Sequence, residues 1–374
     1  MPYLLISNVF FRKAFDVIAI LQKQFDYKFI IGIPSTSRWS HLQASILYKG
    51  YKEILRIENQ TVFFHDLLNI SRKYAAECII YLPIEEVTTD YFYQFCLKYG
   101  SCNFLYQLPP YPIFCLARDK RKLNMYCLAH AIHAPKLYST LTDISESDLP
   151  LILKPKLGSG SSGIIRITTK DDLCKLQKIK DTDYVIQELL PNGRNVKGAF
   201  FLAYQGKLIS AYTHERIRTS PPEGGVSVLS QASYNNDIIE EGRKLIESLN
   251  WSGLLMLEFL YDVRCRQYKI IEANPRIWGS IMLSEYCGSQ MLENYVRLCC
   301  SLPLFGSTIN TNVKIRWFFP VDLLNYIRSG FRINDFWYFH NTCFINWSYA
   351  AWHRAMWFNL SSIFKLKNIQ RFFR

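Results

Sequence analysis

Two apolar runs flank a short polar turn in the stretch Leu254-Leu-Met-Leu-Glu258-Phe-Leu-Tyr-Asp-Val-Arg-Cys-Arg-Gln267-Tyr-Lys-Ile-Ile-Glu272-Ala-Asn274-Pro-Arg276. The runs are residues 254–261 and 267–273, and the turn between them is short enough to join two antiparallel strands. Alternate residues of a strand share a face, so Glu272 and Asn274 point the same way. A paired strand can bring Glu258 beside them. The stretch therefore predicts a β-hairpin with three oxygen donors on one face.

These three side chains are candidate metal ligands. Carboxylate and amide oxygens suit Mg²⁺, which keeps some of its waters and takes other ligands from phosphate. Leu257 and Phe259 around Glu258 indicate that one side of the strand is buried. A buried carboxylate needs a partner, usually a cation. The alternative is an ordinary hairpin with solvent-facing carboxylates.

A glycine- and serine-rich loop follows a third apolar run and Lys154. Gly158, Gly160 and Gly163 match G-x-G-x-x-G, but a dinucleotide-binding fingerprint must open a helix, whereas residues 164–169 are β-branched and strand-like. A Walker A loop is also excluded, because no Lys-Ser or Lys-Thr follows the last glycine. The pattern indicates a hairpin tip whose backbone N–H groups close over phosphates, with Lys154 holding their charge. A flexible surface hairpin is the alternative.

Protein kinases also place a glycine-rich strand–loop–strand over ATP. They additionally need His-Arg-Asp and Asp-Phe-Gly segments. Neither tripeptide occurs here, and the nearest, His353-Arg-Ala355, lacks the aspartate and lies near the end of the chain. The sequence therefore excludes a kinase of that class.

In their order along the chain, these segments resemble the ATP-grasp superfamily, and in particular its carboxylate–amine ligase branch. The resemblance runs from about residue 117 to residue 300, and Arg118-Asp-Lys120 ahead of a helical stretch resembles the opening of the ATP-grasp module. It implies that Glu258, Glu272 and Asn274 bind the metal ion. The implied nucleotide-binding set is Lys120, Lys154, Gly158, Ser159, Gly160, Ser161, Ser162, Gly163, Gln187, Glu188, Leu189, Leu190 and Asn195.

The segment from Gln187 to Leu190 resembles the hinge between the two grasping lobes. In the family, backbone groups of this hinge hold adenine, and its glutamate, here Glu188, holds the ribose or the amino edge. Many relatives carry Gly-x-Glu after the hinge, whereas this chain has Gly193-Arg-Asn195. An amide can still hydrogen-bond a hydroxyl, so Asn195 is the expected ribose contact.

An extended basic segment lies between the hinge and the hairpin. Arg216 and Arg218 share one face of it, and their guanidinium groups suit carboxylate or phosphate. The segment and the Gly224-Gly225 loop after it resemble the acceptor site of uncharacterised carboxylate–amine ligases. A solvated basic edge strand is the alternative. His214 is expected to be a structural histidine rather than a base.

The resemblance implies an ATP-dependent carboxylate–amine (or thiol) ligase that works through an acyl phosphate. Phosphoryl transfer requires mainly positioning and charge neutralisation, and the expected catalytic residues are Arg276, Lys154, Arg216 and Arg218. The expected cofactors are ATP and Mg²⁺, with Mn²⁺ as an alternative ion. The expected partners are a small carboxylic acid and an amine, with no nucleic acid, and an oligomer is compatible with the sequence. Two alternatives stay open: a phosphotransferase acting on an acid or alcohol, and a non-catalytic nucleotide- or membrane-surface-binding module.

Composition indicates a globular enzyme. With 374 residues, 49% of them hydrophobic, the chain can bury a large core and form two or three sub-domains. Its 11 cysteines show no C-x-x-C spacing, which favours a reducing, cytoplasmic location. The apolar residues 3–11 are followed by Arg12 and Lys13, so they predict neither a signal peptide nor a membrane span.

The expected fold class is α/β with α+β sub-domains. Residues 1–112 alternate strand-like runs (4–6, 29–33 and 78–82) with helical segments, which predicts a βα-repeat lobe on a parallel sheet, and a proline cluster at 109–112 marks its end. Residues 113–305 are the predicted ATP-grasp module, with a lid and ATP lobe at 113–186 and a metal and acceptor lobe at 187–305. Residues 306–374 form a predicted helical extension.

That extension is basic and aromatic. Residues 311–374 hold nine Lys or Arg against two Asp, and five of the eight tryptophans. The expected structure is an aromatic cap packed on the core with its charges outside. A membrane surface or a nucleic acid is the alternative partner. The residues concerned are Trp337, Trp347, Trp352, Trp357, Arg354, Lys365, Lys367, Arg371 and Arg374.

Overall fold

The computed structural model describes residues 2–24, 27–34, 37–48, 50–141, 144–158, 163–173, 183–191, 195–220, 226–334, 336–337 and 343–345. The chain divides into two compact units. The first unit comprises Met1–Gln107, Val228–Ala232 and Arg276–Arg374, and the second comprises Leu108–Ser227 and Ser233–Pro275.

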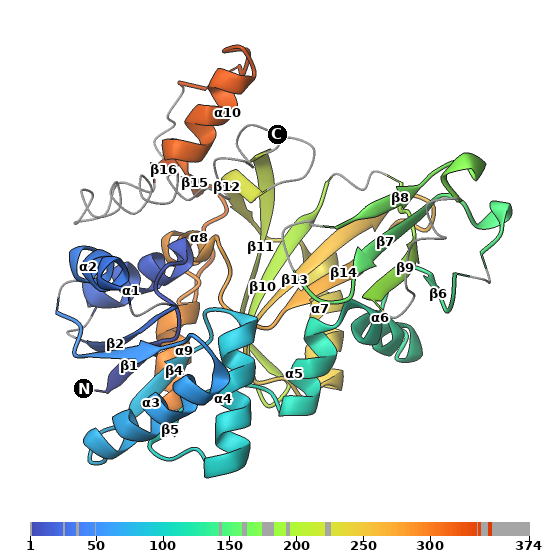
Figure 1. Cartoon of the computed structure of the whole chain (residues 1–374). Coiled ribbons are helices and arrows are strands. Elements are labelled where there is room, and N and C mark those ends of the chain that lie inside the picture. The colour runs from blue at the N-terminus through green and yellow to red at the C-terminus, as the bar shows by residue number, and fades with distance from the viewer. Residues whose placement is uncertain are drawn as a thin grey trace. The chain divides into compact units, whose positions relative to one another are not determined.

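A five-stranded parallel sheet forms the centre of the first unit (Figure 1), with the strand order β3-β2-β1-β4-β5. Its strands are β1 (Tyr3–Ile6), β2 (Lys28–Ile33), β3 (Glu53–Arg56), β4 (Ile79–Leu82) and β5 (Phe104–Leu105). The central strands β1 and β4 are buried along their whole length, which is why both are continuous apolar runs. The predicted parallel βα lobe is confirmed.

Four helices connect these strands: α1 (Arg12–Gln24), α2 (Arg38–Leu47), α3 (Gln60–Lys73) and α4 (Glu86–Tyr99). In Figure 1, α1 and α2 lie on one side of the sheet and α3 and α4 on the other, as right-handed crossovers require when the strand order reverses beside β1. Asn59 begins α3, and its side chain accepts a hydrogen bond from Val62 N. Gly32 permits a close approach, because a Cβ at this position would lie 2.0 Å from Ser7 O.

The remaining elements of the first unit come from the second half of the chain. They are α8 (Ile281–Tyr286), α9 (Met291–Cys299), β15 (Lys314–Arg316), a π-helical turn (Phe318–Asp322), α10 (Leu323–Arg328) and β16 (Cys343–Ile345). Strand β12 (Val226–Ser233) pairs antiparallel with β15, and β15 pairs parallel with β16. Arg316 on β15 is buried, and its Nε lies 2.6 Å from Asp322 Oδ2.

A four-stranded antiparallel sheet forms one layer of the second unit, with the order β6-β9-β7-β8. Its strands are β6 (Leu137–Tyr138), β7 (Leu151–Pro155), β8 (Ile165–Ile167) and β9 (Tyr184–Glu188), and a 3₁₀ turn (Glu146–Asp148) precedes β7. Leu151, Leu153, Ile167 and Ile186 form its core. The predicted strand–loop–strand around the glycine-rich loop is confirmed.

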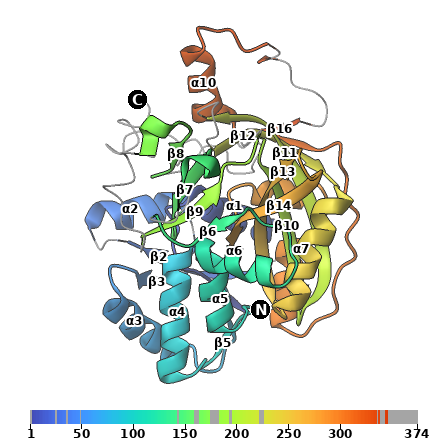
Figure 2. The ribbon, with the colours of Figure 1, turned by 90° about the vertical axis from the view of Figure 1, so that its right-hand side faces the viewer.

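Four neighbouring antiparallel strands of a larger sheet carry the rest of the second unit, in the order β14-β13-β10-β11. These strands are β10 (Lys197–Tyr204), β11 (Lys207–Ser220), β13 (Gly253–Asp262) and β14 (Gln267–Asn274). The helices α5 (Tyr111–Arg118), α6 (Lys120–Ala129) and α7 (Asn236–Ser248) belong to this unit. Figure 2 shows α7 lying along one face of the sheet, where both contribute to one hydrophobic core.

The parallel and antiparallel sheets together confirm the predicted mixed α/β class. Two short strands, β3 and β5, were not predicted. No helix in the described part of the chain has both the length and the apolar composition that a membrane crossing requires. Within the predicted extension, Trp337 is 60% exposed. The other tryptophans and basic residues named for it lie outside the described residues.

Candidate functional site

The large sheet of the second unit has one apolar face and an opposite face, called the polar face here, that carries the ionisable side chains. Leu255, Leu257 and Phe259 of β13 pack in the core shared with α7. Because side chains alternate along a strand, Glu258 points to the opposite face. A register shift after Glu258 inserts one extra residue into β14. This bulge places both Ile270 and Ala273 in the helix-facing core, and so leaves Glu272 and Asn274 on the polar face.

Three oxygen-bearing side chains meet on this polar face. Glu258 and Glu272 are direct partners across the β13–β14 ladder, and Asn274 is opposite Met256, two residues from Glu258. Directly opposed residues have Cβ atoms about 4.5–5.5 Å apart. Asn274 is 3% exposed, and the two carboxylate side chains are 18% and 19% exposed. The hairpin and the shared face are therefore confirmed, whereas the metal-binding role stays a prediction.

Cations surround the two carboxylates. Arg216 on β11 forms an ion pair with Glu258. Lys120, the first residue of α6, has its Nζ 3.6 Å from Glu272 Oε1. Lys154 on β7 is 9% exposed; burial lowers its pKa, and the charges of Glu272 and Glu258 act in the opposite direction. Positive and negative side chains at such short range form a site that can accept both a metal ion and phosphate oxygens.

The glycine-rich turn is attached to this cluster through Lys120. Its Nζ donates to Gly158 O at 2.6 Å, and its backbone N donates to Lys156 O at 3.0 Å. Gly158 and Gly163 have φ of 111° and 72°, which side chains with a Cβ rarely adopt. The two glycines therefore hold the two ends of the turn. Ser159, Gly160, Ser161 and Ser162, which were also predicted to contact the nucleotide, lie outside the described residues.

The residues of the predicted hinge lie at the end of β9 and directly after it. Gln187 is 1% exposed, and its Oε1 has no hydrogen-bond partner within the described structure. Leu189 N donates to Pro150 O at 2.9 Å, and Leu190 packs against Leu260 and Ile271. Both leucines therefore have structural contacts that hold this part of the backbone in place.

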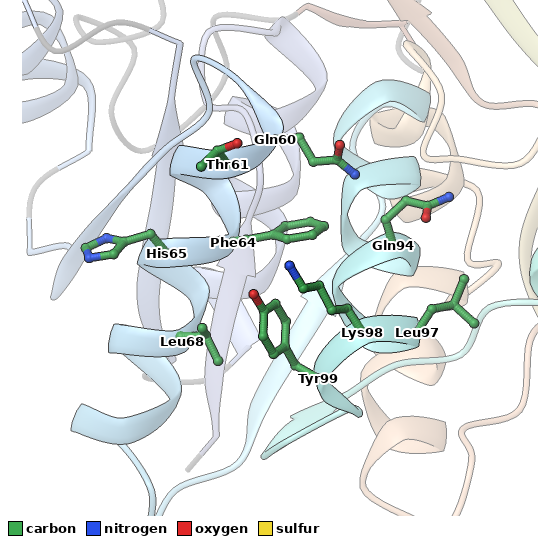
Figure 3. A pocket seen from close by; sticks show the side chains of 9 residues that line it. All are labelled: Gln60, Thr61, Phe64, His65, Leu68, Gln94, Leu97, Lys98 and Tyr99. Carbon is green, nitrogen blue, oxygen red and sulfur yellow. The ribbon is translucent and has the colours of Figure 1, made fainter.

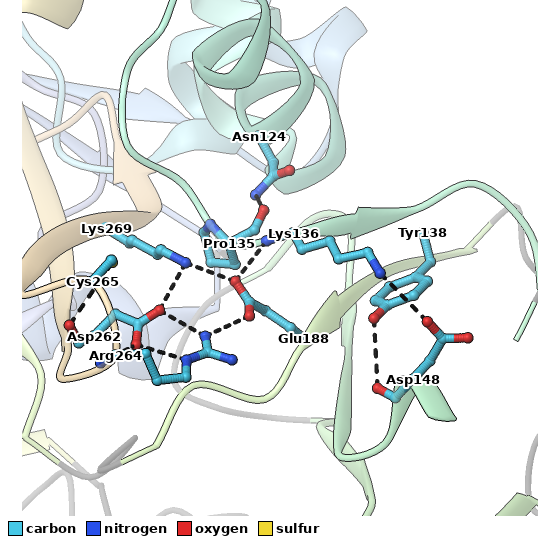
Figure 4. Close-up of polar contacts among 10 residues, drawn as sticks. All are labelled: Asn124, Pro135, Lys136, Tyr138, Asp148, Glu188, Asp262, Arg264, Cys265 and Lys269. Atoms are coloured by element: carbon cyan, nitrogen blue, oxygen red, sulfur yellow. Dashed lines mark hydrogen bonds and ion pairs between the residues drawn. The ribbon is translucent and has the colours of Figure 1, made fainter. Parts of the chain in front are cut away.

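Glu188 lies in an ion-pair network that the sequence did not predict (Figure 4). Its carboxylate is 2.8 Å from Lys269 Nζ and 2.5 Å from Arg264 Nη2, and it accepts a hydrogen bond from Lys136 N at 2.8 Å. Asp262, 1% exposed, binds the same Arg264 and Lys269. Asp262 and Arg264 are two residues apart in the hairpin turn, but their link to Glu188 has no signal in sequence spacing.

The remaining predicted site residues lie at three separate positions in the described structure. Arg218 is half-buried on β11, two residues beyond Arg216, and Asn195 is exposed just before β10. Arg276 belongs to the first unit, where its Nε lies 3.4 Å from Glu86 Oε1 and its Nη1 donates to Ile277 O. The structure thus brings together Lys120, Lys154, Arg216, Glu258, Glu272 and Asn274 within the second unit.

The donor set fits a hard divalent cation. Across the residues that the structure describes, no three His, Cys, Asp or Glu side chains gather closely enough to hold a metal ion. The candidate set is instead two carboxylates and an amide oxygen. Mg²⁺ is usually bound by one or two carboxylates plus phosphate oxygens and water, so two carboxylates suffice when a nucleotide supplies the remaining ligands.

A separate groove of about 630 Å³ lies between α3 and α4 in the first unit (Figure 3). It is lined by Gln60, Thr61, Phe64, His65, Leu68, Gln94, Leu97, Lys98 and Tyr99. No carboxylate is among these lining side chains. The groove therefore lacks the donors that a cation bound to phosphate requires.

Comparison with known proteins gives a family match and one curated relative. Residues 117–280 match the family model of the ATP-grasp domain. Acetyl-CoA carboxylase 2 of Arabidopsis thaliana is 22% identical over 138 residues, which are 34% of this chain and 6% of that protein. The chain therefore matches only a small part of that relative's length.

Solved structures with the same fold cover most of the chain. Biotin carboxylase of Campylobacter jejuni, solved in complex with βγ-ATP, has a TM-score of 0.63 and 15% identity, covering 83% of this chain and 74% of that one. N5-carboxyaminoimidazole ribonucleotide synthetase of Thermus thermophilus has a TM-score of 0.59 and 17% identity, covering 84% and 81%. The ATP-grasp domain predicted from the sequence is confirmed: residues 117–280 match the family model of that domain.

Proposed function

We propose that this chain is an ATP- and Mg²⁺-dependent ligase that joins a carboxylic acid to an amine, or to a thiol, through an acyl phosphate. The observation that supports it best is the polar face on which Glu258, Glu272 and Asn274 lie together, with Lys120 and Arg216 in contact with the carboxylates. A protein without a ligand for this face would bear the desolvation cost of these charges for no gain. Mn²⁺ is proposed as an ion that can replace Mg²⁺.

In this proposal the nucleotide lies between the two sheets of the second unit. Lys120 and Lys154 neutralise its phosphates, and the backbone N–H groups of the turn from Gly158 to Gly163 cover them. The hinge from Gln187 to Leu190 holds adenine. Within the described structure the buried Oε1 of Gln187 has no donor, which suits the exocyclic amine of adenine, because a buried acceptor without a donor is costly. Asn195 is the proposed ribose contact.

The proposed reaction has two steps. An oxygen of the substrate carboxylate attacks the γ-phosphorus, the bond to the bridging oxygen breaks, and ADP leaves. The nitrogen of the amine then attacks the acyl carbon, inorganic phosphate leaves, and the nitrogen loses one proton. Glu258, Glu272 and Asn274 would hold a Mg²⁺ ion, which would supply charge neutralisation for the phosphoryl transfer.

In both steps the chain's own residues bind and orient the reacting groups. Lys120 and Lys154 hold the phosphoryl oxygens, and the proposed partners of the substrate carboxylate are Arg216 and Arg218. The proposed role of Arg276 is to steady the transferred phosphoryl group. No side-chain nucleophile takes part.

A panel assay tests the proposal. The full-length protein is incubated with Mg·ATP, a mixture of carboxylic acids and a mixture of amines, while ADP is measured enzymatically and products by mass spectrometry. The ligase proposal expects ADP release that needs an acid, together with an amide whose formation needs the amine. A stable phosphorylated product that forms equally well without an amine would instead identify the phosphotransferase alternative.

Calorimetry separates both enzyme proposals from a binding module that has lost its nucleotide site. Titration with Mg·ATP is expected to release heat, and millimolar Mg·ATP is expected to raise Tm, because a ligand that binds only the folded state stabilises it. Absence of both effects would contradict any ATP-dependent function.

A further inference from the structure

The imidazole of His214 is a buried group that the proposed chemistry does not use. His214 lies on β11 opposite Gly198 of β10, and Gly198 is in turn opposite Glu258 of β13. These residues therefore form one row across the sheet, which continues to Glu272 on β14. The row lies on the polar face, and Arg216, two residues beyond His214, shares it.

Both ring nitrogens of His214 lack a hydrogen-bond partner in the described structure, although the residue is only 2% exposed. A buried polar atom without a partner destabilises the folded state by about 1–3 kcal/mol. A phenylalanine or leucine would fill the same space without this cost. The histidine is therefore explained most simply by a hydrogen bond that forms only when a ligand is present.

The surroundings of His214 hold its ring in one orientation. Phe200 contacts the imidazole ring edge-to-face, with the two ring centroids 4.8 Å apart, and Tyr212 stacks on Phe200 with a centroid distance of 4.7 Å. Gly198 provides space for the ring, because a Cβ there would lie 2.6 Å from His214 Nε2. The Nε2 edge is thus directed over β10, the strand that separates β11 from the strand of Glu258. The orientation of the ring is thus fixed before any ligand is present, which lowers the entropy cost of binding.

We propose that His214 contacts the acid substrate, with a ring N–H donating a hydrogen bond to an oxyanion held beside Arg216. The oxyanion is either the substrate carboxylate or the phosphoryl group that this carboxylate receives. The inference rests on the proposed ligase function and adds a substrate-contact residue to it.

The charges around the ring favour an anion over an amine. Burial, and after it the charges of Arg216 and Lys197, lower the pKa of His214 well below its usual range, so the ring is neutral at pH 7 and one nitrogen carries a proton. Arg216 shares the face of the ring and can attract a carboxylate or phosphate, whereas Lys197 is paired with Glu215 on the opposite face. Arg216 is 17% exposed, so solvent reaches the face next to the ring.

An NMR experiment tests the contact without knowledge of the natural acid. The full-length protein carries ¹⁵N-labelled histidine, and the signals of His214 are identified by their loss in His214→Phe. Mg·ADP is added first, followed by inorganic phosphate in one arm and acetate in the other. A shift of the His214 signals in the phosphate arm identifies the phosphoryl group, and a shift in the acetate arm identifies the carboxylate.

Two NMR outcomes would overturn the inference. One is unchanged His214 signals in both arms although Mg·ADP raises Tm. The other is a set of signals that already show a strong hydrogen bond before any addition and do not change, as a buried water would produce. Failure of Mg·ADP to raise Tm has a different meaning, because it contradicts the proposed function itself and removes the basis of the inference with it.

Matched variants give a second readout. His214→Phe is expected to melt at the same or a higher temperature and to keep its stabilisation by Mg·ATP, while acid-dependent ADP release falls roughly 10- to 100-fold, the loss expected for a hydrogen bond to a charged group. Recovery in His214→Asn would assign Nδ1, and recovery in His214→Gln would assign Nε2. His130→Phe, at an exposed histidine stacked on Tyr126, is the control. Full acid-dependent activity of His214→Phe would overturn the proposal.

Discussion

At the scale of single residues, Glu272 is the most direct test of the polar face. It lies opposite Glu258, and Lys120 Nζ is 3.6 Å from its Oε1. Glu272→Gln removes a charge and almost no volume, so the fold should be kept while turnover falls by about 10²- to 10³-fold or more, as for loss of one preorganised electrostatic group. Amide formation in the panel assay and Tm are the measurements.

Glu215→Gln is the matched control for this prediction. Glu215 is the residue between His214 and Arg216 on β11, and its side chain is 55% exposed and paired with Lys197. Because neighbouring residues of a strand point to opposite faces, its carboxylate lies away from the site. Equal activity of the Glu272 and Glu215 variants would contradict the metal-ligand assignment.

The network around Glu188 predicts a stability effect. Asp262 is buried and accepts hydrogen bonds from Arg264 Nε at 2.8 Å and from Arg264 Nη2 at 2.6 Å, and its Oδ2 is 2.8 Å from Lys269 Nζ. Asp262→Asn should reduce the free energy of unfolding by about 2 kcal/mol at pH 7, the scale of a hydrogen bond to a charged group. Urea unfolding measures this loss. Asp237→Asn, at an exposed position of α7, is the control.

The same network predicts a pH dependence. Hydrogen bonds from Arg264 lower the pKa of Asp262. Burial alone would raise the pKa of Glu188, but hydrogen bonds from Lys269, Lys136 and Arg264 outweigh burial, so the pKa of Glu188 is also lowered. A carboxyl with a lowered folded-state pKa stabilises the fold fully above its unfolded pKa of about 4 and loses that effect as pH falls through the folded value. The difference between wild type and Asp262→Asn should therefore shrink from pH 6 towards pH 3. A constant difference would contradict the network's role.

Some residue positions could be predicted from the sequence and others could not. The period of two along a strand was sufficient to place Glu272 and Asn274 on one face, and the hairpin brought Glu258 to them. Lys120 and Gly158 are 38 residues apart, so their hydrogen bond required the fold. His214 was expected to be structural, because nothing in its sequence neighbourhood indicates that both its nitrogens lack a partner among the described residues.

At the scale of elements, apolar runs identified β1, β2, β4, β7, β13 and β14 before the fold was known. The bulge in β14 was not predicted, because Ile270 and Ile271 are equally apolar and only the packing shows that Ile270 and Ala273 share the helix-facing core. Strand β3 was also missed. Its sequence, Glu-Ile-Leu-Arg, is short and charged at both ends, and only Leu55 is buried in it.

Helix α7 packs so closely on β10 that its glycine can be tested. A Cβ at Gly242 would lie 2.3 Å from Phe201 Cζ. Gly242→Ala gains helix propensity but crowds the core, and overpacking typically costs about 1–3 kcal/mol, so a lower Tm is expected. Gly306→Ala, where no heavy atom lies within 4 Å of the new Cβ, should leave Tm unchanged. An unchanged Tm for Gly242→Ala would show that Phe201 moves freely.

At the scale of the whole molecule, the first unit is assembled from three separate segments of the chain. This could not be predicted from composition, because the proline cluster at 109–112 and the basic extension both suggest boundaries between consecutive domains. The segments of the first unit are instead joined by particular backbone hydrogen bonds. Within the first unit, Trp317 N donates to Val228 O at 2.8 Å, and Ala232 N donates to Val313 O at 2.9 Å.

Those pairings predict that the first part of the basic extension is required for folding. Val313, Ile315, Trp317 and Phe318 are all buried, and Arg316 also donates to Phe336 O at 2.6 Å and lies over the rings of Phe318 and Phe336. Truncation after Thr311 removes β15, and with it Arg316, which is the ion-pair partner of Asp322, and the aromatic contacts of Arg316. Loss of one partner alone from a buried ion pair costs about 3–5 kcal/mol.

The truncated protein should therefore be insoluble, or show no cooperative thermal transition by circular dichroism. A chain that ends at Ile345 keeps β15, β16 and the contacts of Arg316, and serves as the matched control. The comparison separates the loss of these buried contacts from the loss of positive charge, because the control also lacks the basic residues after 345. A soluble, cooperatively melting protein that ends at Thr311 would show that the contacts of Arg316 do not hold the first unit together.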